Sequence, residues 1–308
     1  MVELQDLYPS NRVRLFISSK GTIEKLQGIE LKKSIQASEG RCVLSEIVTT
    51  APPLVYGVSN AELAVAFGAD MILLNLYDVY NPIIPGAPEW VKYPKDVFEL
   101  TGVIVGVNLE PVSEERANKL GVAKGRLAIP ENALELIKKG AKFIVITGNP
   151  EIGISTKDIT KAIKEIKDIV NEKALIFAGK VNASGISEPI VSHEILLSYV
   201  ENGADGVLIP APGSVPNVEM SEVTKIVKTL HDKESLVICS LDNSLEGADV
   251  ETIRLFAYYG KLIGADIHHI GDAGYYPGIA PPENILCYSI TVKGRRHTYR
   301  RMAMSILR

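Results

Sequence analysis

Several side chains that can do chemistry stand where apolar runs of the sequence end. The candidates for catalysis are His269, Lys180 and Glu46. A neutral imidazole can act as an acid, a base or a metal ligand, and a lysine can form a Schiff base, bind an anion or simply pair with a carboxylate. A glutamate inside an apolar run is costly unless it is paired. We therefore expect Glu46 to meet Lys180, a metal ion or the substrate, with a plain salt bridge as the alternative.

Carboxylates and amides at the ends of other runs suggest a metal site and substrate contacts. Mg²⁺ prefers oxygen ligands, and the carboxylates that could supply them are Asp78, Glu110 and Asp242. No spacing motif ties the three together, so Mg²⁺ is a candidate cofactor and no other cofactor is indicated. The expected substrate contacts are Asn75, Asn108, Thr147, Asn149, Asn243, Ser244, Gly271 and Gly274.

The two glycines among these expected contacts suggest an anion site. Gly271 and Gly274 lie three apart directly after an apolar run, and glycine lets the backbone approach an anion closely. Barrel enzymes often bind phosphate in this region with backbone N–H groups and a helix N-terminus. Asp272 argues the other way, because a carboxylate repels phosphate. A phosphate site and a tight turn into the last helix both remain open.

A repeated phrase identifies the elements that must position these residues. Gly-Ala follows a helical pattern and precedes an apolar run at Gly68, Gly140, Gly203 and Gly264. The glycine is typical of a helix C-cap, and the apolar run is typical of a strand buried on both faces of a parallel sheet. We expect strands at 41–48, 70–76, 102–109, 141–147, 174–180, 204–210, 235–241 and 265–271. The helices between and after them are expected at 59–67, 130–139, 156–172, 188–202, 219–232, 248–263 and 281–306.

Eight strands alternating with helices predict an α/β fold, a (β/α)8 TIM barrel formed by one domain over 1–308. It would carry an N-terminal extension, 1–40, with a helix near 21–38, and a helical closure at 281–308. The third unit is expected to have long loops, at 77–101 and 110–129. The alternative is an open doubly wound sheet, which would want a glycine-rich turn after the first strand. Residues 49–53 contain no glycine, which favours the barrel.

The phrase also sets the strand register, because side chains of a barrel strand alternate between the lumen and the helix layer. Positions four and six after the glycine are apolar in most repeats and should face the helices, His268 among them. Positions five and seven should face the lumen: Leu73, Asn75, Val145, Thr147, Leu208, Pro210, His269 and Gly271. The active site is then expected at the C-terminal ends of the strands.

The overall composition limits the partners and the compartment. A net charge of −4 gives no long-range attraction to nucleic acid or an anionic membrane. No apolar run is long enough to span a membrane and no signal peptide is evident, so we expect a cytoplasmic protein. The basic segment 293–301 is expected to be a solvated, partly interfacial helix end. The loop 81–90 carries the only Trp and would be a lid or a subunit contact; we expect a homo-oligomer.

Three segments of the sequence resemble two known families. Residues 264–301, together with 245–254, resemble an uncharacterised bacterial family of (β/α)8 barrels. Residues 60–70 are similar to the first helix–strand turn of the phosphoenolpyruvate mutase-like barrels, a group that holds Mg²⁺ with carboxylates at strand ends. The acidic motif with that group's spacing is absent here, so the resemblance implies the fold more than the reaction.

Taken together, these features predict a metabolic enzyme that acts on a small anionic metabolite, phosphorylated or carboxylated. Lyase, isomerase and hydrolase chemistry all remain open, with His269 as the acid or base and the 271–274 turn as a phosphate-binding clamp. A non-catalytic barrel that binds a metabolite or regulates a partner is the alternative from another class. A third possibility is a Mg²⁺-dependent phosphotransfer or phosphonate enzyme.

Overall fold

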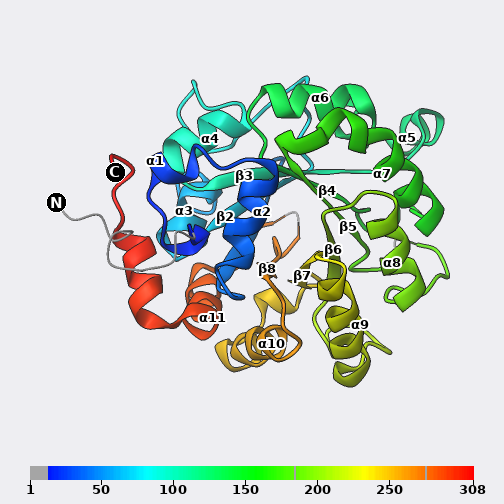
Figure 1. Ribbon diagram of the computed structural model, residues 1–308. Coiled ribbons are helices and arrows are strands. Elements are labelled where there is room, and N and C mark those ends of the chain that lie inside the picture. The colour runs from blue at the N-terminus through cyan, green and yellow to red at the C-terminus, as the bar shows by residue number, and fades with distance from the viewer. Residues whose placement is uncertain (1–12, 184, 275) are drawn as a thin grey trace.

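Eight parallel strands close into a barrel in chain order (Figure 1). The computed structural model describes residues 13–183, 185–274 and 276–308. The strands are β1 Cys42–Val48, β2 Met71–Asn75, β3 Ile104–Leu109, β4 Phe143–Ile146, β5 Leu175–Gly179, β6 Gly206–Pro210, β7 Leu236–Leu241 and β8 Ile267–Ile270. All are buried over their whole length, as expected for strands covered by side chains in the lumen and by helices outside. The predicted (β/α)8 barrel is confirmed.

The strand pairing separates the two adjacent histidines. His269 pairs with Ser240 of β7 and with Leu44 of β1, and paired residues of parallel strands point to the same face. Its ring contacts the Ser240 side chain, so it lies in the lumen. The ring of His268 instead packs edge-on against Tyr288 in the helix layer. The lumen assignment of His269 made from the Gly-Ala phrase is confirmed.

Helices surround the barrel at the expected places (Figure 1). They are α3 Asn60–Ala66, α6 Pro130–Lys138, α7 Thr156–Val170, α8 His193–Glu201, α9 Met220–Asp232, α10 Val250–Leu262 and α11 Pro282–Ala303. The N-terminal segment forms α1 Lys20–Ile23 and α2 Gly28–Gln36 in place of one helix. Short 3-10 turns lie at η2 Leu15–Ile17, η3 Lys124–Arg126, η4 Asn171–Lys173 and η5 Leu245–Gly247.

The third unit has the expected long connecting segments, and each of them also contains a short helix. The segments 77–101 and 110–129 each contain a helix, α4 Pro94–Thr101 and α5 Glu114–Leu120. Both helices stop at a glycine in the left-handed conformation, Gly102 and Gly121. These helices are only two turns long, so the prolines and glycines that cap them outweigh the short apolar pattern within them.

Part of the basic segment near the C-terminus is buried rather than solvated. The Lys293 ammonium lies 2.5 Å from Asp70, and the Arg301 guanidinium lies 3.1 Å from the same carboxylate. All three side chains are almost fully buried. Arg295 and Arg296 are exposed, as expected. The segment therefore fastens α11 to the N-terminal end of β2, because a buried charge is tolerated only when it is paired.

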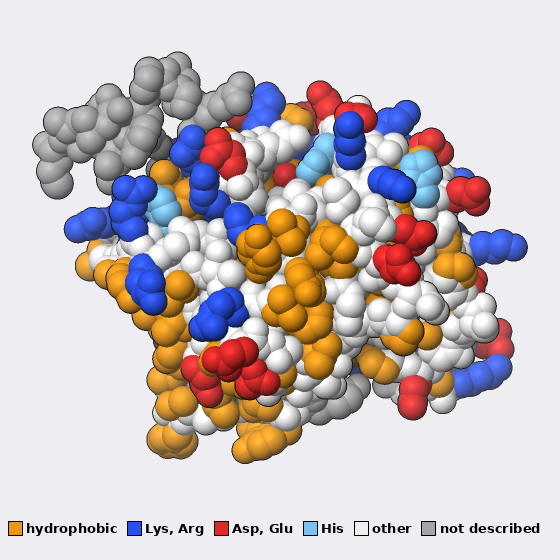
Figure 2. All heavy atoms as spheres, turned by 90° about the horizontal axis from the view of Figure 1, so that it is seen from below, with side chains coloured by type: hydrophobic (Ala, Val, Ile, Leu, Met, Phe, Trp, Pro, Cys, Tyr) orange, Lys and Arg blue, Asp and Glu red, His pale blue; other side chains and the backbone are white. Residues whose placement is uncertain are grey.

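The outer surface bears on two expectations about partners. In the part of the chain that the structure describes, no helix has both the length and the apolar character needed to cross a membrane. The face seen from below Figure 1 carries a group of apolar side chains (Figure 2). On α10, at the bottom of Figure 1, the exposed apolar residues are Leu255, Tyr258 and Leu262. Trp90 in the loop 81–90 is also exposed. The homo-oligomer stays a prediction.

Candidate active site

A cavity of about 150 Å³ opens at the C-terminal ends of the strands. Since one water needs roughly 10–15 Å³ of such space, the cavity has room for a small ligand only. Four carboxyl groups line it, Glu46, Asp242, Glu246 and Asp272. Five amides line it as well, Asn75, Asn108, Asn149, Asn182 and Asn243. No Lys, Arg or His is among the described residues of its wall.

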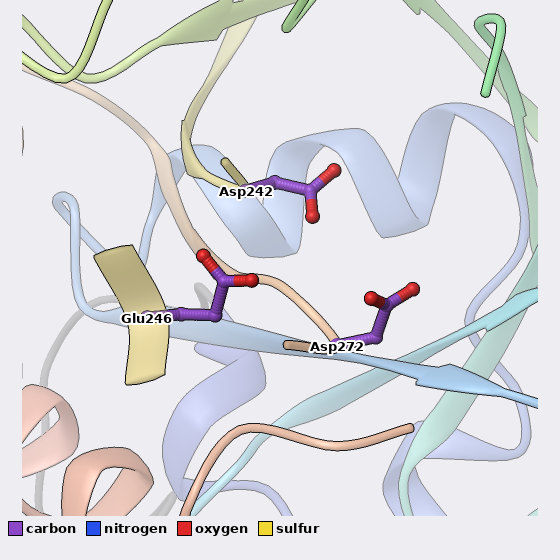
Figure 3. Close-up of side chains that lie close together, drawn as sticks. All are labelled: Asp242, Glu246 and Asp272. Atoms are coloured by element: carbon purple, nitrogen blue, oxygen red, sulfur yellow. The ribbon is translucent and has the colours of Figure 1, made fainter. Parts of the chain in front are cut away.

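Three of the carboxylates form a compact acidic cluster (Figure 3). Asp242 follows β7, Glu246 lies in η5 and Asp272 follows β8. One oxygen from each lies within 4.8 Å of the others, and the three side chains point toward the same space (Figure 3). We call Asp242, Glu246 and Asp272 the acidic cluster.

Backbone N–H groups hold two members of the acidic cluster in place. Glu246 accepts from the N–H groups of Asn243 at 3.1 Å and Ala273 at 3.0 Å. Asp272 accepts from the N–H of Gly274 at 2.7 Å. Ala273 and Gly274 both have positive φ, which turns successive N–H groups toward the carboxylates. Within the described chain Asp242 has no such partner, so its oxygens are the most available for a ligand.

Glycine at position 271 makes room for this arrangement. A Cβ there would lie 2.3 Å from an oxygen of Asp242. The small size of Gly271 therefore lets the Asp242 carboxylate pack beside the chain. Gly271, an expected substrate contact, does not itself line the cavity.

The acidic cluster could hold a divalent metal ion. Burial raises the pKa of Glu246, and burial together with the negative charges of Glu46 and Asp272 raises the pKa of Asp242 well above its ordinary value. A divalent cation would remove this repulsion, and carboxylate oxygens are the ligands that Mg²⁺ prefers. Asn108, which lines the same cavity and is 4% exposed, has an Oδ1 without a hydrogen-bond partner in the described chain. The donor set fits a hard cation.

Glu46 and His269 form a second pair beside the acidic cluster. His269 Nε2 lies 2.8 Å from Glu46 Oε2, although the two are not aligned as a hydrogen bond, and Nδ1 lies 2.7 Å from the Ser240 hydroxyl. Glu46 lines the cavity, whereas His269 and Ser240 lie behind it. Burial, followed by the charges of Asp272 and Glu246, raises the pKa of Glu46 well above its usual range. Burial lowers the pKa of His269. The group that can exchange a proton with a ligand is therefore Glu46, with a neutral imidazole behind it.

Amides connect the acidic cluster to the opposite wall. Asn75 Nδ2 donates to Asp272 at 3.2 Å and to Asn149 Oδ1 at 3.1 Å. Asn75 Oδ1 accepts from Asn108 Nδ2 at 3.2 Å, and Asn149 Nδ2 donates to Glu110 at 2.5 Å. This network brings together the ends of β2, β3 and β4, as the sequence predicted for Asn75, Asn108 and Asn149. Of the other expected contacts, Thr147, Asn243, Ser244 and Gly274 also line the cavity.

Three expected site residues have partners away from the cavity wall. Lys180 Nζ lies 3.5 Å from Glu188, because Gly179 faces the lumen and the next residue faces outward. Glu110 pairs with Arg126 at 2.8 Å. Asp78 accepts from the N–H of Tyr80 and holds a turn. Of the metal ligands expected from the sequence, Asp242 alone lines the cavity. Glu46 meets His269, not Lys180.

Sequence reasoning missed three residues that matter here, Glu246, Ser240 and Glu188. Glu246 stands three residues after Asn243, so a turn that returns its carboxylate to the Asn243 N–H was a detectable signal. Ser240 is two residues before Asp242, and the period of a strand places it on the same face. Glu188 meets Lys180 only through folding, and its spacing carries no signal.

A family model described as a domain of unknown function, DUF7916, matches residues 18–308. The chain belongs to the DUF7916 family. The resemblance to an uncharacterised barrel family is thereby confirmed. No protein of curated function matches the DUF7916 sequence.

Solved structures share the barrel of the DUF7916 chain at low identity. It is similar to 2,3-dimethylmalate lyase, a PEP mutase/isocitrate lyase superfamily member, with 12% identity, a TM-score of 0.50, and coverage of 81% of this chain and 82% of that one. For oxaloacetate acetylhydrolase the identity is 12%, the coverage 81% and 82%, and the TM-score 0.49. For an endo-beta-1,4-mannanase from Thermotoga petrophila they are 13%, 85% and 79%, and 0.49. At such identities the likeness shows the fold alone, which agrees with the distant similarity seen at residues 60–70.

Proposed function

We propose that this protein is a metal-dependent enzyme that moves a proton on a small, oxygen-rich metabolite, in a reaction of the lyase or isomerase type. The observation that carries the proposal is the placing of Glu46 beside the acidic cluster in one cavity. The first feature supplies a proton donor or acceptor and the second supplies ligands for a cation. The likeness of the fold to 2,3-dimethylmalate lyase is consistent with lyase chemistry.

Asp242, Glu246 and Asp272 would hold the ion, and Mg²⁺ is the metal that their oxygens suit. When bound, the ion would act as a Lewis acid toward a substrate oxygen and stabilise the negative charge that develops there. The phosphorylated or carboxylated metabolite expected from the sequence would then have one way to bind in the cavity. Since the described wall carries no basic side chain, an oxyanion could enter only as a ligand of the ion.

Glu46 would take or give the proton. Its raised pKa brings the carboxyl group nearer to neutral pH, where a general acid or base works best. His269 would position the Glu46 carboxyl group through the 2.8 Å contact of its Nε2, while Ser240 holds the ring through Nδ1. His269 is thus a positioning residue in this proposal, and Glu46 takes the acid or base role that the sequence suggested for the histidine.

Solvent exchange on a panel of small metabolites tests the proposal. Each candidate metabolite is incubated in D₂O with protein and MgCl₂, and deuterium incorporation is followed by NMR. We expect exchange that EDTA abolishes and that Glu46→Gln lowers by about 10²–10⁴-fold. Glu46→Gln should still bind Mn²⁺. Binding of a metabolite without exchange or turnover would instead support the non-catalytic barrel, and exchange that survives Glu46→Gln would overturn the role of Glu46.

A further inference from the structure

The cavity presents more hydrogen-bond acceptors than donors, and this excess bears on the ligand. Its described wall holds four carboxyl groups and no basic side chain. A divalent ion in the acidic cluster would neutralise two negative charges and leave the wall negative or neutral. A ligand with a second anionic group would have no cationic partner among these residues.

The loops after β7 and β8 are where barrel enzymes often bind phosphate through backbone N–H groups. Here the N–H groups of Asn243 and Ala273 donate to Glu246, and that of Gly274 donates to Asp272. Two carboxylates of the protein therefore occupy the donors that a phosphate would need. The turn at 271–274 is built around internal anions, not prepared for an external one.

The amide network fixes which atom of each amide is left without a hydrogen-bond partner. A carboxylate only accepts hydrogen bonds, so Asp272 requires Asn75 to present its NH₂ group. Asn75 Oδ1 in turn requires the NH₂ group of Asn108. Asn108 is left with its Oδ1 buried and without a partner in the described chain.

Asn243 repeats this pattern on the other side of the cavity. Its Nδ2 donates at 2.7 Å to the carbonyl oxygen of Ser214, which again only accepts. The Oδ1 of Asn243 is buried and has no partner among the described residues. Two amide oxygens of the cavity wall thus need hydrogen-bond donors, and a ligand can supply them.

Two basic side chains near this end of the barrel, Arg126 and Lys180, do not change the balance. Arg126 is paired with Glu110 at 2.8 Å, and Lys180 with Glu188 at 3.5 Å. Each of these two cations lies beside a carboxylate outside the cavity wall, so neither adds a positive charge to the wall.

We propose that the ligand is a small polyhydroxylated compound without a phosphate group, whose hydroxyls donate to Asn108 and Asn243. A hydroxyl can donate a hydrogen bond and coordinate a cation through its oxygen at the same time. An ammonium group cannot coordinate the ion, and a carboxylate cannot donate to an amide oxygen. The role of the ion rests on the proposed function, whereas the need for donors rests on the amide oxygens alone.

Matched ligands test the proposal. Erythritol and D-xylose are titrated into wild-type protein by calorimetry, each against its terminal monophosphate, with and without MnCl₂. Succinate and 1,4-diaminobutane serve as the dianionic and the ammonium probes. We expect each hydroxylated compound to bind at least tenfold more tightly than its phosphate. Tighter binding of a phosphate, of succinate or of the diamine would overturn the proposal, as would the absence of binding by both hydroxylated probes at millimolar concentration.

A variant separates this proposal from the function. Asn108→Leu removes the buried acceptor and keeps the three carboxylates, so we expect about tenfold weaker binding of the hydroxylated probe, measured without metal. Asn118→Leu, on the exposed face of α5, is the control and should leave that affinity unchanged. If the wild-type protein fails to bind Mn²⁺, the metal-dependent function fails, yet the preference measured without metal still decides the ligand class. Equal probe affinity in wild type and Asn108→Leu would overturn the role of Asn108.

Discussion

At the scale of single residues, the carboxyl groups of the cavity repel one another, and the protein tolerates this only if protons or a cation compensate. The pKa values of Glu46, Asp242 and Glu246 are all raised in the folded state, with burial as the largest cause. The unfolded values are about 4. The folded protein therefore holds more protons than the unfolded chain above that pH, and these groups stabilise the fold less as the pH rises.

The first prediction concerns this pH dependence. In metal-free protein, the stability that these protonated carboxyls contribute is fully present below about pH 4 and is lost as the pH rises through their raised folded values. We expect Asp242→Asn to flatten the fall in the free energy of unfolding between pH 5.5 and 8.5, measured by urea denaturation. Mn²⁺ should raise the melting temperature of the wild type more at the higher pH, because protons no longer compete with the ion. The same slope in wild type and variant would contradict the crowding of these carboxyls.

The second prediction concerns His269, which touches Glu46 but does not line the cavity. His269→Ala should fold, leave Mn²⁺ affinity unchanged and lower the exchange rate by about 10²-fold, since the proton-transfer group loses its orienting partner. Ser240→Ala should have a smaller effect in the same direction, because it leaves the imidazole in place. Steady-state kinetics distinguish the cases: a positioning role predicts a fall in kcat with little change in KM. A loss of Mn²⁺ binding in His269→Ala would show that the histidine serves the ion instead.

At the scale of elements, the register of the strands was the most predictable part of the site. The Gly-Ala phrase marks where strands begin, and alternation along a strand then places His269 and Asn75 in the lumen. The same alternation, continued by one residue, excludes Lys180 from the lumen; its position at the end of an apolar run suggested otherwise. Of the acidic cluster only Asp242 was predicted as a metal ligand, because Glu246 reaches the cluster through a local turn at Asn243, which strand alternation does not encode.

Lys180 has its own role at this scale, which gives the third prediction. Glu188 accepts from both the N–H and the hydroxyl of Thr156 at the start of α7, and it pairs with Lys180. It thereby fastens the segment after β5 to α7. Glu188→Gln should destabilise the protein by about 1–2 kcal/mol, discounted because Glu188 is 32% exposed while Lys180 is buried.

Two controls refine this third prediction. Lys180→Met combined with Glu188→Gln should recover much of the loss, because no buried charge is then left unpaired. Glu165→Gln, in the exposed pair with Lys161, should cost less than about 0.5 kcal/mol. Urea denaturation measures all of these variants. If Glu188→Gln behaves like Glu165→Gln, the contact with Lys180 does not hold the segment.

At the scale of the whole molecule, the two ends of the barrel treat charge in opposite ways. The C-terminal end gathers carboxylates without cations among the described residues of the cavity wall, which suits a site that binds a metal ion. At the other end, the carboxylate of Asp70 pairs with both Lys293 and Arg301, and all three side chains are buried. The proposed site and the closure of the fold thus lie at opposite ends, as is usual for barrels.

The last prediction follows from this separation. Asp70→Asn leaves Lys293 and Arg301 buried without a counter-charge, and breaking a buried pair in this way costs about 3–5 kcal/mol. We expect the free energy of unfolding to fall by that amount. Helix α11 should lose hydrogen-exchange protection first, because Lys293 and Arg301 both lie in it and Arg301 also binds the carbonyl oxygens of Leu15 and Phe16. Mn²⁺ affinity of the folded fraction should not change, since Asp70 lies at the N-terminal end of β2.

Glu115→Gln, in an exposed pair on α5, is the matched control and should hardly change the free energy of unfolding. Weakened Mn²⁺ binding in folded Asp70→Asn would show that the two ends are coupled, and an unchanged stability would show that α11 is held by its apolar contacts alone.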